Sequence, residues 1–246
     1  MEKEKKKKIV VFSGAGVSAE SGVATFRDAK TGLWENHKVE DVASPEGWRR
    51  NRGLVLKFYN ERRRQLPTVQ PNDAHKLIAE LEKDYDVTVV TQNVDDLHER
   101  GGSTKIIHLH GELTKARGCF YNHKPSPADN IIDIGYNDIN EGDKCPVTDS
   151  QLRPHIVWFG EYPFGREEAM KAMEEADILI IVGTSLMITY TLHMLTEVPL
   201  DCRIFFIDPK PSPEIGLYRK NVKFLATTAT AGMKEVYNEL MQTENV

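Results

Sequence analysis

The sequence predicts an α/β fold, in which helices cover both faces of a doubly wound parallel sheet and a smaller module is inserted. Two observations carry this prediction: short apolar runs alternate with segments of helical periodicity, and a glycine-rich turn follows the first run. Near-continuous apolar runs are typical of parallel strands that are buried on both faces. The predicted strands are Ile9–Phe12, Val87–Val90, Ile106–Leu109, Ile156–Phe159, Ile178–Val182, Ile204–Ile207 and Val222–Leu225.

Helical periodicity between the strands predicts at least six helices. Ser44 and Pro45 begin one of them well, because serine caps a helix and proline fits its first turn. We expect this helix to continue to about Leu66. The other predicted helices are Asn72–Asp84, Val94–Arg100, Arg166–Glu175, Thr189–Val198 and Ala231–Met241.

Two irregular segments interrupt the alternation and predict the inserted module. One is polar and contains glycine, and the other is rich in Asn, Asp, Gly and Pro. We expect a single domain over residues 1–246, with a disordered tail over residues 1–7. Its Rossmann-like core would comprise approximately residues 8–30, 68–112 and 154–242, and its small module approximately residues 31–67 and 113–153.

Composition narrows the class of protein. The 246 residues are 40% apolar and 28% charged, as in an ordinary globular chain long enough for one large core. A net charge of −5 gives no reason to expect nucleic-acid binding, and no run reaches the ~18–20 apolar residues of a membrane span. Three widely spaced cysteines favour a reducing compartment over a disulfide framework. We therefore expect a cytoplasmic protein without nucleic-acid or membrane partners, and its oligomeric state is left open.

The glycine-rich turn follows the strand Ile9–Phe12 and reads Gly14-x-Gly16-x-x-Ala19. Glycines after a strand let the backbone approach a phosphate, and N–H groups at the start of the next helix favour its charge. Alone, this pattern is a weak indication of a dinucleotide site. The continuation, which ends in Phe26-Arg27, is rarer and suggests that the site consumes its nucleotide.

Polar side chains follow two further strands. Gln92, Asn93 and Asp95 come after Val87–Val90, and amide and carboxyl groups can bind ribose hydroxyls and a carboxamide. The alternative is that Asn93 or Asp95 only caps the next helix.

A second strand end repeats this arrangement. Gly183, Thr184 and Ser185 follow Ile178–Val182 and favour a phosphate or ribose site, although an ordinary turn is the alternative. Asp208 closes another strand and would accept bonds from the adenosine ribose. Its carboxylate would also repel an additional phosphate on that ribose.

Two histidines, His108 and His110, stand two apart in a predicted strand and therefore face the same side. His110 comes last, before Gly111, where it would reach the edge of a cleft. An imidazole that titrates near neutrality suits proton abstraction from a hydroxyl, although an isolated histidine is often structural.

Together these residues resemble the sirtuins, the NAD-dependent protein-lysine deacylases. The resemblance spans about residues 8–240 and implies NAD as co-substrate and acyl-lysine proteins or peptides as substrates. Nicotinamide and an O-acyl-ADP-ribose would be the products. Six motifs occur in the family's order, namely Gly14–Gly22, Phe26-Arg27, Thr91–Asp95, Leu109–Gly111, Phe159–Glu161 and Gly183–Ser185.

The resemblance also implies roles in catalysis. The acyl oxygen would attack the ribose carbon as nicotinamide leaves, with His110 as general base for the ribose hydroxyls. Asn93 is the second catalytic residue that the resemblance implies. Asn93 and Asp95 would seat nicotinamide, and Gln92 would contact its ribose. Phe26 would shield the reacting carbon. The remaining cofactor-binding residues implied are Gly14, Ala15, Gly16, Ala19, Arg27, Trp34, Val94, Gly183, Thr184, Ser185, Asp208 and Ala229.

Within the family, the chain is most similar to the class that prefers acidic acyl groups. The markers are the segments Val39–Pro45 and Phe58–Arg63. A succinyl or malonyl carboxylate needs a polar partner in an apolar tunnel, and Tyr59 and Arg62 share one face of a helix. Ala43 would leave room for the group. The alternative is that arginines 62–64 form an exposed basic face.

The same resemblance places a substrate peptide beside the segment Val157–Glu161, where it would pair by strand addition. The substrate-binding residues implied are Ala43, Tyr59, Arg62, Val157, Phe159, Gly160 and Glu161.

The chain departs from the family in its cysteines. Sirtuins usually hold a structural zinc with two Cys-x-x-Cys pairs, whereas Cys119 is followed here by Asn122, and Cys145 by Thr148. Two thiolates fall short of four ligands, so we expect no structural zinc. His123, Asp143 or Asp149 would have to complete a site.

Two other functions stay open at this point. One is ADP-ribosyl transfer or NAD hydrolysis at the same site, and the other is a non-catalytic NAD-sensing module. The presence of Gln92, Asn93, Asp95 and His110 argues against the second. A hydride-transferring oxidoreductase fits worst, because no convincing strand precedes a ribose-reading acid about 20 residues after the glycines.

Overall fold

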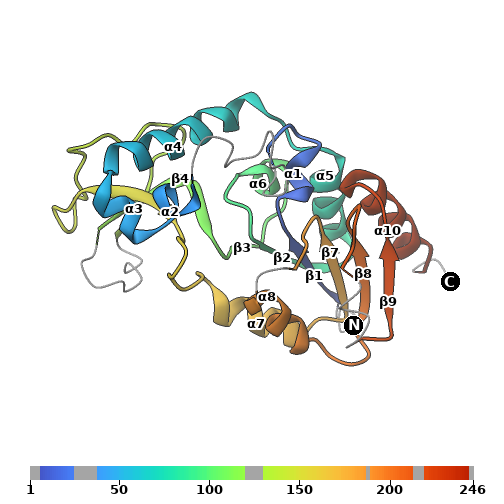
Figure 1. Ribbon diagram of the computed structural model, residues 1–246. Helices are drawn as coiled ribbons and strands as arrows, with labels where there is room; N and C mark the ends of the chain where they lie inside the picture. The colour runs from blue at the N-terminus through green and yellow to red at the C-terminus, as the bar shows by residue number, and fades with distance from the viewer. Residues whose placement is uncertain (1–5, 25–37, 120–129, 187–188, 213–218, 244–246) are drawn as a thin grey trace, which may run out of the picture.

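The computed structural model describes residues 6–24, 38–119, 130–186, 189–212 and 219–243. Six parallel strands form the main sheet in the order β3-β2-β1-β7-β8-β9 (Figure 1). This confirms the predicted α/β class. The strands are β1 (Lys8–Ser13), β2 (Asp86–Thr91), β3 (Ile106–His108), β7 (Ile178–Val182), β8 (Arg203–Ile207) and β9 (Val222–Leu225).

The strand order sets the position of a binding cleft. The chain builds from β1 through β2 to β3 on one side, and then places β7, β8 and β9 on the other. The loops after β1 and β7 are therefore neighbours at the point where the strand order reverses. Open α/β sheets bind ligands at this point, beyond the carboxyl ends of the strands.

Helices cover the two faces of the sheet, as Figure 1 shows. Ile9 and Val11 of β1 pack in the cluster that includes α5 (Asp73–Glu80) and α10 (Ala229–Thr243). Val10 and Phe12 pack with α7 (Arg166–Glu174) and α8 (Thr189–Thr196). Both faces of β1 are thus buried, which explains its uninterrupted apolar run. The shorter helices are α1 (Gly16–Ala19), η1 (Leu66–Thr68), η2 (Leu81–Lys83) and α6 (Leu97–Gly101).

The small module combines three helices with a three-stranded antiparallel sheet of order β5-β4-β6. Its core is a separate apolar cluster built around Trp48, Phe58 and Trp158. Figure 1 shows its helices gathered at one end of the molecule beside β4. Its elements are α2 (Val39–Val42), α3 (Pro45–Arg50), α4 (Arg52–Gln65), β4 (Gly111–Gly118), β5 (Ile131–Asp133) and β6 (Leu152–Ile156).

The prediction assigned one strand to the wrong sheet. We expected Ile156–Phe159 to join the parallel sheet, but Ile156 is the last residue of β6, which pairs with β4 in the small module. Residues 157–159 continue beyond the strand. An apolar run indicates a buried strand without indicating its partner, because pairing depends on contacts that are distant in sequence.

Two predicted helices have different bounds. The helix expected from Pro45 to about Leu66 is divided into α3 and α4 at Asn51, whose backbone is not helical. The Asn51 side chain accepts a bond from the N–H of Leu54 at 3.0 Å, and this local bond competes with the continuous helix. The helix expected from Val94 begins only at Leu97.

Among the described residues, no helix combines the length and apolar character needed to cross a membrane.

Candidate active site

The glycines after β1 serve the packing of two loops. The N–H of Gly14 donates to the carbonyl of Val182 at 3.1 Å, and that of Gly16 donates to Gly183 at 2.8 Å. A Cβ on Gly16 would lie 2.6 Å from Gly183 Cα. Gly183 itself has a φ of +65°, which favours glycine. The glycine pattern is therefore explained by the close contact between the loops at the reversal point.

Ala15 lies between these glycines and differs from them in its hydrogen bonding. No described residue accepts a bond from its N–H, and Ala15 lines the pocket described next. The helix α1 is a single turn without a side-chain cap, and Ala19 at its end is exposed. The backbone of Ala15 is thus the part of this loop that can still donate to a ligand.

One pocket of about 200 Å³ lies between the sheet and the small module. Gln92, Asn93 and Asp95 line it from the loop after β2, and Tyr59 and Arg62 line it from α4. It therefore joins the predicted nicotinamide residues to the predicted acyl-recognition residues. The other lining residues are Ala15, Val23, Ala24, Ala43, Phe58, Gln65, Leu66, Val94, Leu113, Ile156, Val157 and Phe159.

Ser18 connects the two buried polar groups at the sheet end. Its hydroxyl donates to Asp95 Oδ2 at 3.0 Å and accepts from Asn93 Nδ2 at 3.0 Å. Asp95 Oδ1 accepts from the N–H of Leu97, the first residue of α6, at 3.1 Å, and Asp95 also lines the pocket. Burial raises the pKa of Asp95 to about 6, despite these hydrogen bonds. The site thus holds a carboxyl group that titrates unusually close to neutrality.

A second buried layer lies behind Ser18, and the sequence did not indicate it. Ser13 Oγ donates to Thr91 Oγ1 at 2.9 Å and lies 2.9 Å from His98 Nε2. The rings of His75 and His98 meet edge to face, with centroids 4.9 Å apart. Burial lowers the pKa of His75 to about 4 and that of His98 also falls, so both rings are neutral. These residues belong to four separate segments, which only the fold brings together.

His110 is held in one orientation by the loop that contains Gln92. Its Nδ1 donates to the Gln92 carbonyl at 2.9 Å, so the Nε2 of the neutral ring carries the lone pair. Burial lowers the pKa of His110 to about 4, which leaves the ring neutral at pH 7. His110 is not among the residues that line the pocket, but its neighbours Gln92 and Val157 are. Thr184 Oγ1 also donates to Gln92 Oε1 at 3.0 Å.

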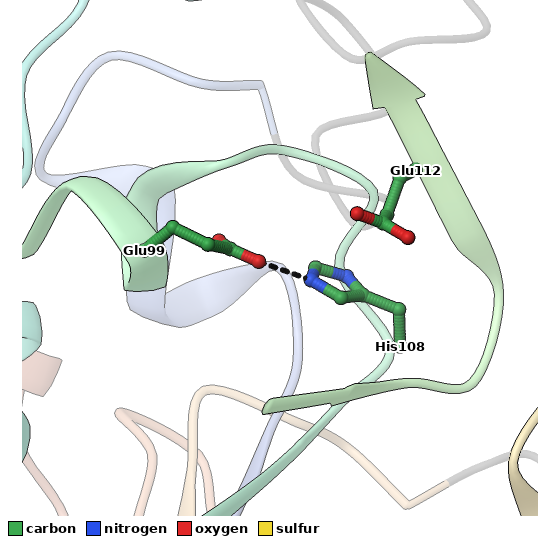
Figure 2. Close-up of side chains that lie close together, drawn as sticks. All are labelled: Glu99, His108 and Glu112. Atoms are coloured by element: carbon green, nitrogen blue, oxygen red, sulfur yellow. Dashed lines mark hydrogen bonds and ion pairs between the residues drawn. The ribbon is translucent and has the colours of Figure 1, made fainter. Parts of the chain in front are cut away.

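His108 holds the adjacent carbonyl of the same loop. Its Nδ1 donates to the Asn93 carbonyl at 3.1 Å, and its Nε2 lies 2.6 Å from Glu99 (Figure 2). Burial opposes the charge on His108, but Glu99 outweighs burial and raises its pKa. Glu112, on the other side of the ring in Figure 2, pairs with Lys115 at 2.7 Å. Ligand atoms of His108 and the two glutamates lie within 4.8 Å of one another. Because both nitrogens of His108 are already bonded, we interpret the group as a clamp on the loop.

The three consecutive arginines of α4 have three different environments. Arg62 is half-buried, with its guanidinium 3.3 Å from the centroid of the Phe58 ring and its Nη1 2.8 Å from the Phe58 carbonyl. Burial lowers the pKa of Arg62 to about 10, so it stays charged at neutral pH. Arg63 is fully buried, and Arg64 is exposed and pairs with Asp138. The alternative of one exposed basic face is therefore wrong.

The segment that follows β6 is held by hydrogen bonds to other parts of the chain. The N–H groups of Val157 and Phe159 donate to His110 and Ala43, while no described donor reaches the carbonyls of Val157 and Phe159. A paired peptide would therefore have to use these carbonyls. Gly160 is exposed with a φ of +89°.

Glu161 has mainly internal partners. It accepts bonds from Arg117 at 3.1 Å, from Arg153 at 2.7 Å and from the backbone N–H of Trp158 at 2.9 Å. Its carboxylate thus holds the segment together.

Several predicted residues lie away from the pocket lining. Ser185 is half-buried after β7. Asp208 is buried at the end of β8 and accepts from the N–H of Lys210 at 2.8 Å. Ala229 is buried at the start of α10. The predicted residues Phe26, Arg27 and Trp34 lie outside the described residues.

The two module cysteines have different environments. Cys145 is buried, and its Sγ donates to Asn130 Oδ1 at 3.2 Å. Cys119 is half-buried, and burial raises the pKa of its thiol. The positions of Asn122 and His123 lie outside the described residues, so the absence of structural zinc stays a prediction.

Comparison with known proteins identifies the family. Residues 14–190 match the profile described as the Sir2 family. This chain belongs to the Sir2 family. The Sir2-family protein "NAD-dependent protein deacylase" of Helicobacter pylori (strain ATCC 700392 / 26695) is 47% identical over 236 residues, which cover 96% of this chain and 98% of the relative.

Two further Sir2-family comparisons agree. The protein of the same description from Bacteroides thetaiotaomicron is 50% identical over 205 residues, covering 83% of this chain and 86% of that one. A crystal structure of a Sir2 homologue–NAD complex has a TM-score of 0.82 at 34% identity. The similarity covers 97% of this chain and 91% of that structure. The sequence resemblance to sirtuins is thereby confirmed.

Proposed function

We propose that this chain is an NAD-dependent protein deacylase that prefers succinyl- and malonyl-lysine over acetyl-lysine. The observation that carries the proposal is the single pocket that joins Asn93 and Asp95 to Tyr59 and Arg62. The similarity to proteins described as NAD-dependent protein deacylases, along nearly their whole length, supports the general reaction. We also propose the cytoplasmic location that the sequence favours.

The sheet end of the pocket has the chemistry to hold nicotinamide. A carboxamide donates and accepts hydrogen bonds, and the Asn93 amide and Asp95 carboxyl group can match it. Bound NAD would supply the ribose carbon that receives the acyl oxygen, with nicotinamide as the leaving group. Ser18 keeps Asn93 and Asp95 in place.

His110 has the protonation state of a general base. It is neutral at pH 7, and its Nδ1–H is given to the Gln92 carbonyl. Its Nε2 can therefore take a proton from a ribose hydroxyl. The fixed hydrogen bond at Nδ1 also sets the plane of the ring, which favours one direction of proton transfer.

The module end of the pocket has the chemistry to hold a carboxylate. Arg62 brings a positive charge to a wall that is otherwise largely apolar, and Tyr59 brings a hydroxyl. Ala43 lines the same pocket with a small side chain. A charge-assisted bond of this kind is worth roughly 1.5–3 kcal/mol, or about 10–150-fold in discrimination.

The test compares acetyl-, succinyl- and malonyl-lysine peptides of one sequence, incubated with NAD. We expect all three to be deacylated, with the acidic acyl groups preferred. Arg62→Met should reduce the succinyl-to-acetyl ratio of kcat/KM by about 10-fold or more. Arg64→Met, the same substitution on the exposed side of α4, should leave the ratio unchanged.

The products decide among the competing functions. Nicotinamide release without deacylated peptide would instead indicate ADP-ribosyl transfer or NAD hydrolysis, and neither product would indicate a non-catalytic module. Equal loss of desuccinylation and deacetylation in Arg62→Met would contradict the acidic-acyl preference.

A further inference from the structure

The Tyr59 hydroxyl has a buried donor behind it. Tyr59 lines the pocket from α4, and its oxygen accepts a hydrogen bond from Trp158 Nε1 at 3.1 Å. Both side chains are buried, with 5% and 2% of their surfaces exposed. Trp158 follows β6, and 99 positions separate the two residues in sequence. The contact therefore joins the segment that follows β6 to the wall of the proposed acyl pocket.

The direction of this hydrogen bond is unambiguous. An indole nitrogen can only donate, so the Tyr59 oxygen must accept and its own proton must point elsewhere. Burial raises the pKa of Tyr59 to about 12, so the phenol keeps this proton at working pH. Among the described residues, none accepts a bond from the Tyr59 hydroxyl. The proton is available to a ligand in the pocket.

Trp158 is itself held rigidly on several sides. The Arg153 guanidinium lies 3.2 Å from the centroid of its ring, and the Trp48 ring centroid lies 5.6 Å away. Glu161 accepts from both Arg153, at 2.7 and 3.0 Å, and the Trp158 backbone N–H, at 2.9 Å. The indole N–H is thus fixed before any ligand arrives, as preorganised recognition requires.

We propose that Trp158 is a positioning residue for acyl recognition, which orients the Tyr59 hydroxyl to donate to the carboxylate of an acidic acyl group. The inference rests on the proposed preference for succinyl and malonyl groups. An acetyl methyl group has no acceptor for this proton, so the orientation of the hydroxyl discriminates between acyl groups. A donor behind the oxygen also polarises the O–H bond, which strengthens the bond it donates.

The competing explanation is that Trp158 only fills space in the small module. Trp48 provides a matched control, because its indole lies in the same aromatic cluster, whereas the hydrogen bond to the Tyr59 hydroxyl comes from Trp158. Trp158→Phe and Trp48→Phe each remove an indole N–H and part of a buried ring. A packing effect would appear in both variants, whereas an effect on Tyr59 belongs to Trp158 alone.

The test measures kcat/KM for succinyl- and acetyl-lysine peptides of one sequence. Relative to the intact protein, Trp158→Phe should reduce the succinyl-to-acetyl ratio of kcat/KM by about 3–10-fold. This reduction should come from a higher KM for the succinyl peptide. Trp48→Phe should leave the ratio within about twofold. Trp158→Met, which fills space without a donor, serves if Trp158→Phe does not fold.

A double-mutant cycle with Tyr59→Phe isolates the coupling. In the Tyr59→Phe background, Trp158→Phe should change the ratio no further, since the hydroxyl it orients is gone. A Trp158→Phe ratio equal to that of Trp48→Phe, or full additivity in the cycle, would overturn the positioning role. If neither Arg62→Met nor Tyr59→Phe shifts the ratio, the acidic-acyl preference itself fails.

Discussion

Replacing Asp95 with asparagine should stabilise the ligand-free protein at pH 7 and strongly reduce nicotinamide release. Asp95 is buried, and the donors to its carboxyl group within the described part of the chain are neutral, Ser18 and the N–H of Leu97. Its ionised form is therefore poorly compensated for the loss of water. Such a group costs stability in the free protein and is typical of functional sites.

The size of the effect follows from the pKa. Burial raises the pKa of Asp95 from 3.8 to about 6, which corresponds to about 3 kcal/mol between the two protonation states. The folded state binds the proton more tightly than the unfolded state, so ionisation destabilises the fold as pH rises through this window. The gain in Asp95→Asn should be absent below about pH 4 and complete above about pH 6.

Unfavourable contacts of the new asparagine should offset part of this gain in stability. The asparagine amide would face Ser18 Oγ, which already accepts from Asn93. We therefore expect a net gain of about 1–2 kcal/mol at pH 7, or about 3–6 °C in Tm for a chain of this size.

Thermal unfolding from pH 4 to pH 8 checks this prediction as the difference between variant and intact protein. The neighbouring Asp96→Asn is the matched control, since Asp96 pairs with Arg100 at 3.3 Å and should lose stability. A constant difference across the pH range, or a lower Tm of Asp95→Asn at pH 7, would refute the reasoning. A stabilised variant with undiminished nicotinamide release would contradict the role of Asp95 in binding.

Two further predictions concern the small module. Arg63→Met removes donors to the Leu113 carbonyl at 2.5 Å and to Asn60 Oδ1 at 2.6 Å, and should lower the free energy of unfolding by about 2–4 kcal/mol in urea titrations. Arg64→Met, at an exposed position, should lower the free energy of unfolding by no more than about 1 kcal/mol. Equal losses in the two variants would contradict the stabilising role of the buried bonds of Arg63. Elemental analysis should find the purified protein without stoichiometric zinc, and EDTA should leave its Tm unchanged. One zinc per chain would show that Cys119 and Cys145 still belong to a metal site.

Local patterns predicted most of the elements, since burial on both faces leaves a direct trace in composition. The runs at Ile9–Phe12 and Ile178–Val182 are strands of the parallel sheet at nearly the predicted bounds. The pairing partner of each strand was harder to predict. Ile156 was therefore assigned to the parallel sheet, although it belongs to β6 of the small module. Asn51 divided a helix through a side-chain bond that periodicity does not detect.

For the site, motif order predicted which residues to examine, but not how they act together. Ser18, Trp158 and the buried pair His75 and His98 carry contacts that no spacing in the sequence indicates, because each contact joins segments that are far apart along the chain. The phosphate contact of Gly14 and Gly16 stays a prediction, and the structure adds a second reason for these glycines, the close approach of the loop after β7.

The sequence by itself determined the α/β class, the family resemblance and the candidate residues for the chemistry. Each of these depends on residue type and local order, which are properties of the linear chain. Only the tertiary structure decided that three consecutive arginines have three different environments, which direction the Tyr59 hydroxyl can donate, and why Asp95 titrates near pH 6. These depend on burial and on hydrogen-bond partners, and both arise only when distant segments fold against one another.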